Sequence, residues 1–383
     1  MEENLIRDAG LSRSIQYSAA GSRRSRMALL TGATGFLGVN LLYDLLEHTS
    51  LEVRCLVRAA GESEGFGKLR HALEAHRLWR SEFASRIRPV IGDLSAPGLG
   101  LSDREFFTLG KHLDVIYHNG AQINLVLPYR ALRSVNVLGT LELLRLAAIA
   151  PVRAFHHISS VAVLSLDHGE TPPEIQESLS LPPANGLTSG YAKAKWVAEQ
   201  LVSEAAGNGL NVSIYRPGLI SGHSRTGVCN LRDSFSLTLQ ACLRLAVTPE
   251  LSGIIYLTPV DFVSRAIVEL SNSAYSGGKA FLINNPVPAR WEEIMELMRA
   301  RGYAHNSVPY AEWIRLLRRK AEEPSQRDLE PIAALMRDSP PDNKKVPVGR
   351  NTAEGLAEFP DVRCPDDSAT LVRLYLSYLS SLD

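Results

Sequence analysis

The chain has 383 residues, of which 45% are hydrophobic and 21% charged, and its 41 Lys and Arg balance its 41 Asp and Glu. This length exceeds that of a typical single domain, so one large unit and one smaller unit are expected. The balanced charge excludes a global electrostatic attraction to nucleic acid or to membranes. The cysteines Cys55, Cys229, Cys242 and Cys364 lack CxxC spacing, which argues against a disulfide framework or a metal site.

The N-terminal region is polar and ends in the basic run Arg23-Arg24-Ser25-Arg26, so residues 1–26 are predicted to be a linker or surface arm. It shows no signal-peptide pattern, and no apolar run reaches the roughly 18 residues that a membrane helix needs. A soluble, cytoplasmic protein is therefore expected, and we expect it to be a monomer.

From Met27 onward, short apolar runs alternate with helical patterns. The runs are often β-branched, which predicts strands at Met27–Leu30, Val53–Val57, Pro89–Ile91, Val115–Tyr117, Phe155–Ile158 and Val212–Tyr215. The clearest helix is predicted at Ala131–Ala148, where leucines and small apolar residues recur at spacings of three and four. This alternation predicts an α/β fold with a Rossmann-type, doubly wound parallel sheet, which binds ligands at the carboxyl ends of its strands.

The pattern thins after about Ser224, and a last strand is predicted at Phe281–Asn284. Beyond it, helices are predicted at Trp291–Met298, Ala311–Lys320, Asp328–Arg337 and Ala369–Leu379. We therefore predict a nucleotide-binding domain at residues 27–285 and a mostly helical second unit at residues 286–383.

A glycine-rich turn follows the first predicted strand and reads Thr31-Gly32-Ala33-Thr34-Gly35-Phe36-Leu37-Gly38. Glycines permit the tight turn and let the backbone approach a pyrophosphate, which then lies against the N-terminus of the following helix. A purely structural glycine turn is the alternative. The context of strand, turn and amphipathic helix favours a dinucleotide site.

Three further strand ends extend this site. The second strand is followed by Arg58, with Lys68 nearby, where an NAD-binding protein would carry an acidic residue for the ribose 2′-hydroxyl. A guanidinium there accommodates a 2′-phosphate and so predicts NADPH, unless Arg58 is a solvated surface charge. Asp93 and Leu94 are placed to contact the adenine, and Asn119, Gly120 and Ala121 offer a small-residue platform beneath the cofactor.

Tyr191 and Lys195 are spaced to lie on one face of a helix. A neighbouring ammonium favours a phenolate, so we expect Lys195 to lower the pKa of Tyr191. Hydride addition to a carbonyl or thioester leaves negative charge on oxygen, which a proton donor and a hydroxyl would stabilise. Ser160, after the fifth predicted strand, is expected to supply that hydroxyl, and Ser159 is its rival. A YxxxK match alone is common in amphipathic helices, but here it follows the other motifs in the order that a bound dinucleotide requires.

These motifs resemble those of the extended short-chain dehydrogenase/reductases. Within that superfamily the chain resembles the terminal thioester reductase domains of nonribosomal peptide and polyketide synthases, which are related to carboxylic acid and aminoadipate reductase domains. The resemblance runs from about Arg7 to the C-terminus. It is carried by the glycine turn, Cys55-Leu56-Val57-Arg58-Ala59, His118-Asn119-Gly120-Ala121-Gln122-Ile123-Asn124, Asn136-Val137-Leu138-Gly139-Thr140, Gly190-Tyr191-Ala192-Lys193-Ala194-Lys195 and Arg216-Pro217-Gly218.

The resemblance implies that NADPH reduces a phosphopantetheine thioester on a carrier protein to an aldehyde, which some members reduce further to an alcohol. It assigns the catalytic hydroxyl to Ser160, where many members have Thr, and adds Asn136 and Ser159 to the cofactor site. It also implies that Pro217, Gly218, Leu219 and Ile220 line the nicotinamide and that the C-terminal helical unit covers the acyl channel. Lys68 stands where relatives often have Arg.

An acidic carrier protein is the partner that the resemblance implies. Two basic clusters are candidates for its docking, Arg23-Arg24-Ser25-Arg26 and Arg315 with Arg318-Arg319-Lys320, although charge runs are usually solvated surfaces. Two other functions stay open. One is an extended reductase, epimerase or dehydratase that acts on a free small molecule such as a nucleotide sugar or an acyl-CoA. The other is a non-catalytic dinucleotide sensor, which would not need Tyr191 and Lys195.

Overall fold

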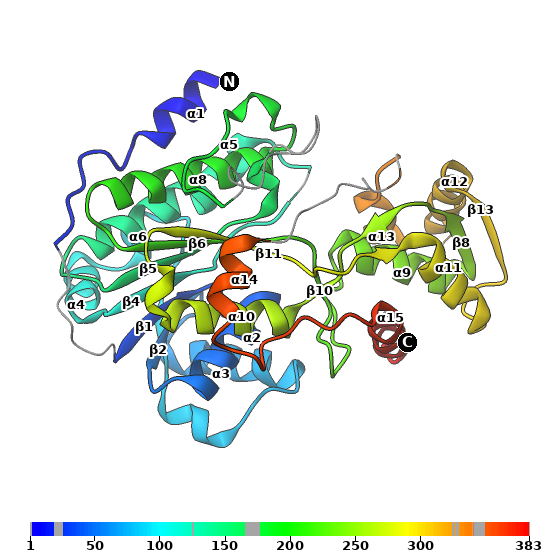
Figure 1. The fold of residues 1–383 in the computed structure, drawn as a ribbon, viewed down its shortest axis with the longest axis horizontal. Coiled ribbons are helices and arrows are strands. Elements are labelled where there is room, and N and C mark those ends of the chain that lie inside the picture. The colour runs from blue at the N-terminus through cyan, green and yellow to red at the C-terminus, as the bar shows by residue number, and fades with distance from the viewer. Residues whose placement is uncertain are drawn as a thin grey trace. The chain divides into compact units, whose positions relative to one another are not determined.

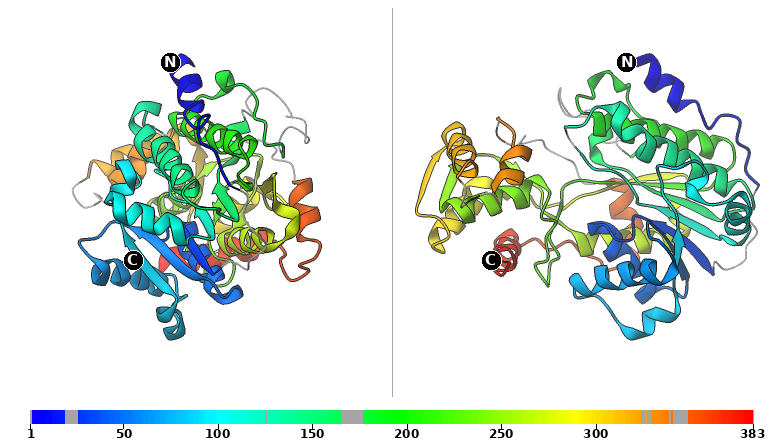
Figure 2. Two further views of the ribbon diagram at one scale, coloured as in Figure 1. Left: turned by 90° about the vertical axis from the view of Figure 1, so that its left-hand side faces the viewer. Right: turned by 180° about the vertical axis from the view of Figure 1, so that it is seen from behind.

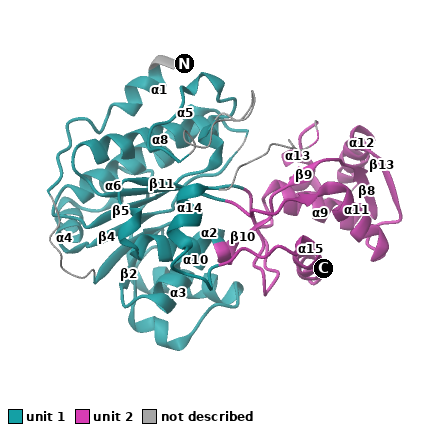
Figure 3. Cartoon of the chain, in the orientation of Figure 1, with its two compact units in different colours: residues 1–218, 263–283, 348–362 teal, residues 219–262, 284–347, 363–383 magenta. Residues whose placement is uncertain are grey.

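A computed structural model of the chain describes residues 2–18, 26–124, 126–164, 177–323, 326, 329–338, 340 and 349–382. The chain forms two units and passes between them several times (Figure 3). The first unit comprises Met1–Gly218, Val263–Ile283 and Val348–Val362, and the second comprises Leu219–Phe262, Asn284–Pro347 and Arg363–Asp383.

This division differs from the predicted boundary after residue 285. Residues 219–262 precede that boundary but belong to the second unit, whereas residues 348–362 follow it but belong to the first. Strand β11 (Lys279–Ile283) explains the difference, because it pairs with β6 (Val212–Pro217) in the sheet of the first unit. Residues 219–262 are thus part of an excursion between two neighbouring strands.

The first unit is built on a seven-stranded sheet in the order β11-β6-β5-β4-β1-β2-β3. Every neighbouring pair is parallel, which confirms the predicted fold class. β1 lies between β2 and β4, and this is the switch point at which such sheets bind ligands. The other strands are β1 (Met27–Thr31), β2 (Glu52–Val57), β3 (Ile87–Ile91), β4 (Val115–His118) and β5 (Ala154–Ile158).

Helices cover both faces of this sheet, with α5, α6 and α8 on one face and α2, α3 and α10 on the other (Figures 1 and 2). The helices of the first unit are α1 (Glu2–Ala9), α2 (Phe36–His48), α3 (Glu62–Ala75), α4 (Asp103–His112), α5 (Tyr129–Arg133), α6 (Gly139–Ala147), α8 (Gly190–Gly207), α10 (Val260–Asn272), which begins in the second unit, and α14 (Arg350–Leu356). Short 3-10 turns lie at Ser81–Ser85, Pro97–Gly100, Val161–Leu164, Ala184–Gly186 and Ala274–Ser276.

The single helix predicted at Ala131–Ala148 is interrupted. A π-helical turn, Ser134–Leu138, joins α5 to α6, and the backbone N–H of Gly139 donates to the carbonyl of Ser134. A π-helical turn contains one residue more than an α-helical turn. Apolar residues at spacings of three and four do not reveal it, because the helices before and after the turn each keep an apolar face.

The segment predicted as a linker or surface arm contains a helix and packs on the first unit over residues 2–17, whereas Arg23, Arg24 and Ser25 lie outside the described residues. α1 packs against α8, and Leu5 is 2% exposed. The hydroxyl of Ser12 donates to the carbonyl of Leu201 at 3.0 Å. A few specific contacts therefore make this segment part of the first unit. The polar composition of the segment, on which the prediction was based, does not reveal such contacts.

The second unit has its own core, in which Phe235, Trp291, Trp313 and Tyr375 are buried. It contains all four helices predicted beyond residue 285, and also α9, which lies where the sequence pattern thins. Its elements are β7 (Ile220–Ser221), α9 (Ser234–Leu245), β8 (Val247–Glu250), β9 (Ile254–Ile255), β10 (Thr258–Pro259), β12 (Ala289–Arg290), α11 (Trp291–Ala300), β13 (Asn306–Pro309), α12 (Tyr310–Ala321), α13 (Glu330–Leu335) and α15 (Ser368–Ser380). Among the described residues of both units, no helix is long and apolar enough to cross a membrane.

Candidate active site

The glycine turn connects β1 to α2 and is closely packed. Gly32 has a φ of +71°, and a Cβ there would lie 2.7 Å from the Cα of Gly120, after β4. A Cβ on Gly38 would overlap the carbonyl oxygen of Gly32, so the first turn of α2 rests directly on the loop. Only residues without a side chain allow these approaches.

The N-terminus of α2 suits an anion. Gly35 is its N-cap and supplies no side-chain hydrogen bond, and the first turn carries no acidic residue. The first N–H groups of α2 therefore lack a side-chain cap at the positive end of a helix of 13 residues. This arrangement fits the pyrophosphate of a dinucleotide. Thr34, Phe36 and Leu37 lie in the same turn.

A hydrogen-bonded chain links this turn to the end of β4. The N–H of Gly120 donates to the hydroxyl of Thr31 at 2.8 Å, and that hydroxyl lies 2.9 Å from Nδ1 of His118. On the other side of the ring, Nε2 lies 2.8 Å from the hydroxyl of Thr140, which itself donates to the carbonyl of Asn136. Because the proton of the Thr140 hydroxyl is directed at Asn136, Nε2 of His118 carries the ring hydrogen and Nδ1 accepts from Thr31.

This assignment makes His118 a neutral structural link. Burial lowers the pKa of His118 to about 3, and the charge of Lys195 acts in the same direction. The sequence motif drew attention to Asn119, Gly120 and Ala121 but not to the histidine before them. The signal that could have found it is an imidazole at the end of a buried strand, where every polar atom needs a partner.

The amides of the platform also hold the backbone. Asn136, in the π-helical turn, accepts from the N–H of Gln122 at 2.7 Å and donates to its carbonyl at 3.0 Å. Asn119 donates to the carbonyl of Gly32 at 3.4 Å. These side chains therefore fix the loop after β4 against the glycine turn.

The predicted adenosine side of the site is more exposed. Arg58 follows β2 and is exposed. Hydrogen bonds from the backbone and side chain of Ser95 hold the pKa of Asp93 below its usual value, and the charge of Arg58 adds a smaller effect in the same direction. Lys68 donates to the carbonyl of Arg58 at 2.8 Å and pairs with Glu64 at 2.6 Å. Leu94 lies against Gly120 and Gly139, so it helps to pack the platform. Of these two cations, Lys68 is already paired with a carboxylate, whereas the side chain of Arg58 makes no ion pair with the described residues.

The predicted catalytic residues converge at the end of β5. The side chain of Ser160 lies close enough to the hydroxyl of Tyr191 to lower its pKa, although burial acts more strongly in the opposite direction. Lys195, one turn further along α8, donates from Nζ to the carbonyl of Ile158 at 2.7 Å and is 4% exposed. α8 begins after Ser189, whose hydroxyl accepts from the N–H of Ala192 at 3.0 Å. The N-cap thus fixes the turn that carries Tyr191.

Ser159, the rival hydroxyl, points elsewhere. It donates to Oε2 of Glu199 at 2.6 Å, and Oε1 of Glu199 accepts from Nε of Arg216 at 2.9 Å. Both members of this ion pair are fully buried. The pair joins α8 to β6, and sequence reasoning missed it because the two residues do not share a motif.

The expected lowering of the Tyr191 pKa is not found. Burial raises the pKa of Tyr191 to about 12, against a smaller opposing effect of the hydrogen bond with Ser160. Burial also lowers the pKa of Lys195 to about 8, while Glu199 opposes that shift. Desolvation penalises both charged forms, so at neutral pH Tyr191 is a neutral phenol that can donate a proton.

Residues 217–220 straddle the two units. The N–H of Gly218 donates to the carbonyl of Ile283 at 3.2 Å in the first unit. Ile220 pairs with Thr258 across β7 and β10 in the second unit, where the N–H of Thr258 donates to the carbonyl of Leu219 at 3.2 Å. Pro217 ends β6.

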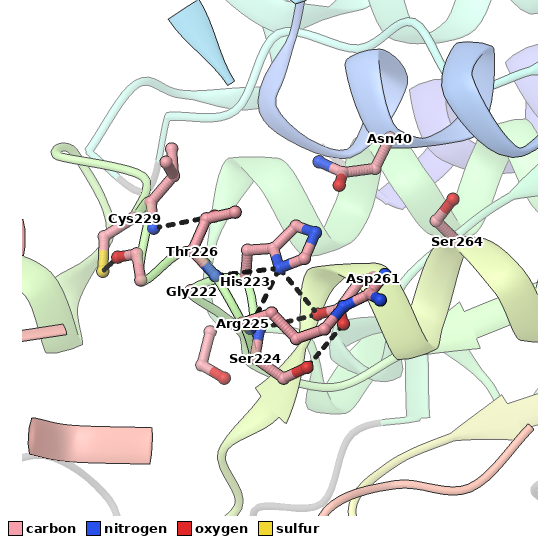
Figure 4. Close-up of polar contacts among 12 residues, drawn as sticks. Asn40, Gly222, His223, Ser224, Arg225, Thr226, Cys229, Asp261 and Ser264 are labelled. Atoms are coloured by element: carbon pink, nitrogen blue, oxygen red, sulfur yellow. Dashed lines mark hydrogen bonds and ion pairs between the residues drawn. The ribbon is translucent and has the colours of Figure 1, made fainter. Parts of the chain in front are cut away.

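The loop that follows is held by polar contacts within the second unit (Figure 4). Asp261 accepts from the N–H of Ser224 at 2.8 Å and from its hydroxyl at 2.6 Å. His223 accepts from the N–H of Arg225 at 3.1 Å through Nδ1. Asp261, in the first turn of α10, therefore anchors this loop.

The second basic cluster lies on α12. Arg315, Arg318 and Arg319 are exposed, and Arg318 pairs with Asp338 at 2.7 Å. Lys320 pairs with Glu323 at 3.0 Å. In the first cluster only Arg26 belongs to the described residues.

Comparison with known proteins identifies the family. The model of the male sterility protein family matches residues 30–267. A linear gramicidin synthase of Brevibacillus parabrevis is 37% identical over 355 residues, which are 92% of this chain and 7% of that protein. The large chain of the L-2-aminoadipate reductase of Eremothecium gossypii is 32% identical over 336 residues, or 83% of this chain and 24% of that protein. The chain therefore spans only a small part of these relatives.

Among solved structures, the terminal R domain from the myxalamid PKS-NRPS biosynthetic pathway is similar over 100% of this chain and 98% of that chain. Its sequence is 40% identical and the TM-score is 0.90. These similarities agree with the dinucleotide turn and the converging Ser160, Tyr191 and Lys195, and they confirm the resemblance seen in the motifs. The chain belongs to the male sterility protein family of NAD(P)-binding oxidoreductases and, within it, to the terminal reductase domains of nonribosomal peptide and polyketide synthases.

Proposed function

We propose that this chain reductively releases an acyl or peptidyl group from the phosphopantetheine thioester of a carrier protein, with NADPH as the reductant and an aldehyde as the product. The observation that carries the proposal is the convergence of Ser160, Tyr191 and Lys195 at the carboxyl end of β5. The bare backbone of the glycine turn supports the cofactor half of the proposal.

The glycine turn would hold NADPH, which when bound would supply a hydride to the thioester carbon. The negative charge left on the former carbonyl oxygen would be stabilised by the hydroxyls of Tyr191 and Ser160. Tyr191 donates its proton to that oxygen, and the hemithioacetal then separates into an aldehyde and the free pantetheine thiol. Lys195, held by the carbonyl of Ile158, keeps a positive charge next to Tyr191 and balances the phenolate that forms.

A panel of thioesters tests this function. The protein is incubated with NADPH and either acyl-pantetheine or acyl-carrier thioesters, and the loss of NADPH absorbance is followed while mass spectrometry identifies the aldehyde or alcohol. Tyr191→Phe removes the proposed proton donor and serves as the catalytic control. Oxidation of the cofactor with nucleotide sugars but with no thioester would overturn the proposal in favour of a reductase of free small molecules.

We assign the preference for NADPH to Arg58. The rest of the cofactor site is assigned to the residues at the strand ends described above. Arg58→Ala should raise the KM for NADPH by about tenfold to a hundredfold and leave the KM for NADH almost unchanged, because a charge-assisted hydrogen bond to the 2′-phosphate contributes about 1.5–3 kcal/mol. Arg70→Ala on α3 is the matched control, since Arg70 is an exposed guanidinium paired with Glu74. An equal rise for both cofactors would remove Arg58 from this role.

A further inference from the structure

Asp8 in the N-terminal arm is a buried carboxylate with three hydrogen bonds. It is 1% exposed. Its Oδ2 accepts from the hydroxyl of Tyr129 at 2.6 Å and from Nε of Arg133 at 2.6 Å, and its Oδ1 accepts from Nη2 of Arg133 at 2.7 Å. Asp8 of α1 thus hydrogen-bonds both the first and the last residue of α5, which lie more than 120 positions away along the chain.

The start of α5 in turn supports the start of α8. A Cβ on Gly190 would lie 2.6 Å from the backbone nitrogen of Tyr129 and would overlap the carbonyl oxygen of Leu127. The N-terminus of α8 therefore rests on the backbone of Leu127 to Tyr129 with no spare room. Tyr191 is the next residue of α8, and it carries the hydroxyl that meets Ser160.

The rest of the arm runs along α8 away from Tyr191. Ser12 bonds the carbonyl of Leu201, and Arg13 pairs with Glu204 at 2.8 Å. The side chain of Asn208 donates to the carbonyl of Ile15 at 3.0 Å. These contacts hold the arm on the helix, and within the described part of the arm Asp8 is the residue whose side chain hydrogen-bonds α5.

We propose that Asp8 is a positioning residue for Tyr191, which it serves by fixing Tyr129 and with it the backbone on which the first turn of α8 rests. The inference depends on the role of Tyr191 in the proposed function. A shift of about 1 Å in a reacting group can lower the rate by about a hundredfold. Displacement of α5 should therefore slow proton transfer from Tyr191. In the described part of the chain neither Asp8 nor Tyr129 bonds the glycine turn, and Asn136 after α5 keeps its own two hydrogen bonds to Gln122, so cofactor binding should be spared.

The experiment uses the full chain with NADPH and octanoyl-pantetheine as the probe thioester. Tyr129→Phe removes one hydroxyl from the network, and Asp8→Asn removes the charge. We expect both to lower kcat by about tenfold or more and to change the Kd for NADPH by less than about twofold. We also expect the solvent deuterium isotope effect on kcat to rise, because proton donation by a misplaced phenol becomes rate-limiting.

Arg13→Ala is the control, because it breaks an exposed contact of the same arm far from Tyr191 and should leave kcat and the isotope effect unchanged. The inference is overturned if folded Tyr129→Phe keeps the wild-type kcat, or if kcat falls only in proportion to the fraction of protein that binds NADPH, with the isotope effect unaltered. If the Asp8→Asn variant does not fold, the Tyr129→Phe variant alone tests the positioning role of Asp8. Full turnover by Tyr191→Phe would instead defeat the proposed function.

Discussion

At the scale of single residues, the site is dominated by desolvation. Tyr191, Lys195 and His118 are all buried, and burial shifts each pKa toward the neutral form. The sequence motif suggested that Lys195 acidifies Tyr191, but in this structure burial raises the pKa of Tyr191 and the opposing effect comes from Ser160. A neutral tyrosine is the form that a reductase needs as a proton donor, whereas the reverse oxidation would need a base.

The lowered pKa of Lys195 predicts how the rate of reduction depends on pH. Because the pKa of Lys195 is lowered to about 8, its ammonium is present below pH 8 and is lost as the pH rises through that value. We expect kcat/KM to fall above about pH 8, while Tyr191 remains protonated until much higher pH. In Lys195→Arg, whose guanidinium does not deprotonate, this alkaline decline should vanish from the residual activity. A decline that persists there would exclude Lys195 as its source.

The buried ion pair predicts a stability effect. Glu199→Ala leaves the guanidinium of Arg216 buried without its carboxylate, which should lower the free energy of unfolding by about 3–5 kcal/mol. Glu204→Ala, on the same helix, breaks a partly exposed pair with Arg13 and should cost less than about 1 kcal/mol. Urea unfolding of both variants measures the difference, and equal losses would contradict this account.

At the scale of elements, the turn between β1 and α2 depends on close backbone contacts. Gly38→Ala forces a methyl group against the carbonyl of Gly32, which cannot move without opening the turn. We expect the affinity for NADPH to fall by about tenfold or more, because a loss of about 1.4 kcal/mol suffices for that. Titration of bound NADPH fluorescence measures it.

Gly67→Ala provides the matched control. Gly67 lies in α3, and a Cβ there would meet nothing within 4 Å. The same substitution should therefore leave NADPH affinity unchanged, and it should stabilise the helix by roughly 0.4–1 kcal/mol. Weakened binding in both variants would show that steric contact at Gly38 is not the cause.

At the scale of the whole molecule, each unit is discontinuous in sequence, and the second unit carries the exposed arginines of α12. If these dock an acidic carrier protein, turnover of a carrier-linked thioester should fall as salt rises from about 0.05 to 0.5 M, since screening shortens the range of surface charges. Turnover of free octanal should not change. Arg315→Glu with Arg319→Glu should reproduce the loss at low salt, and salt-independent carrier turnover would count against docking at α12.

Some features of this protein were determined by the sequence alone. The seven strands, the parallel doubly wound sheet and the dinucleotide turn follow from local patterns, because apolar periodicity and glycine spacing act over a few residues. The proximity of the three proposed catalytic residues was also predicted, since Tyr191 and Lys195 share a helix and Ser160 follows the end of β5. The family motifs carried the rest of the functional assignment.

Other features were decided only by the tertiary structure. The ion pair of Glu199 with Arg216, the link through His118 and the grip of Asp8 on Tyr129 join residues that are distant in sequence, and a local pattern has no means to pair them. The same holds for the division into units, because it depends on β11 returning to β6 after a long excursion. The pKa of Tyr191 belongs to this group as well: spacing places a lysine beside it, but only packing determines how much water both groups lose.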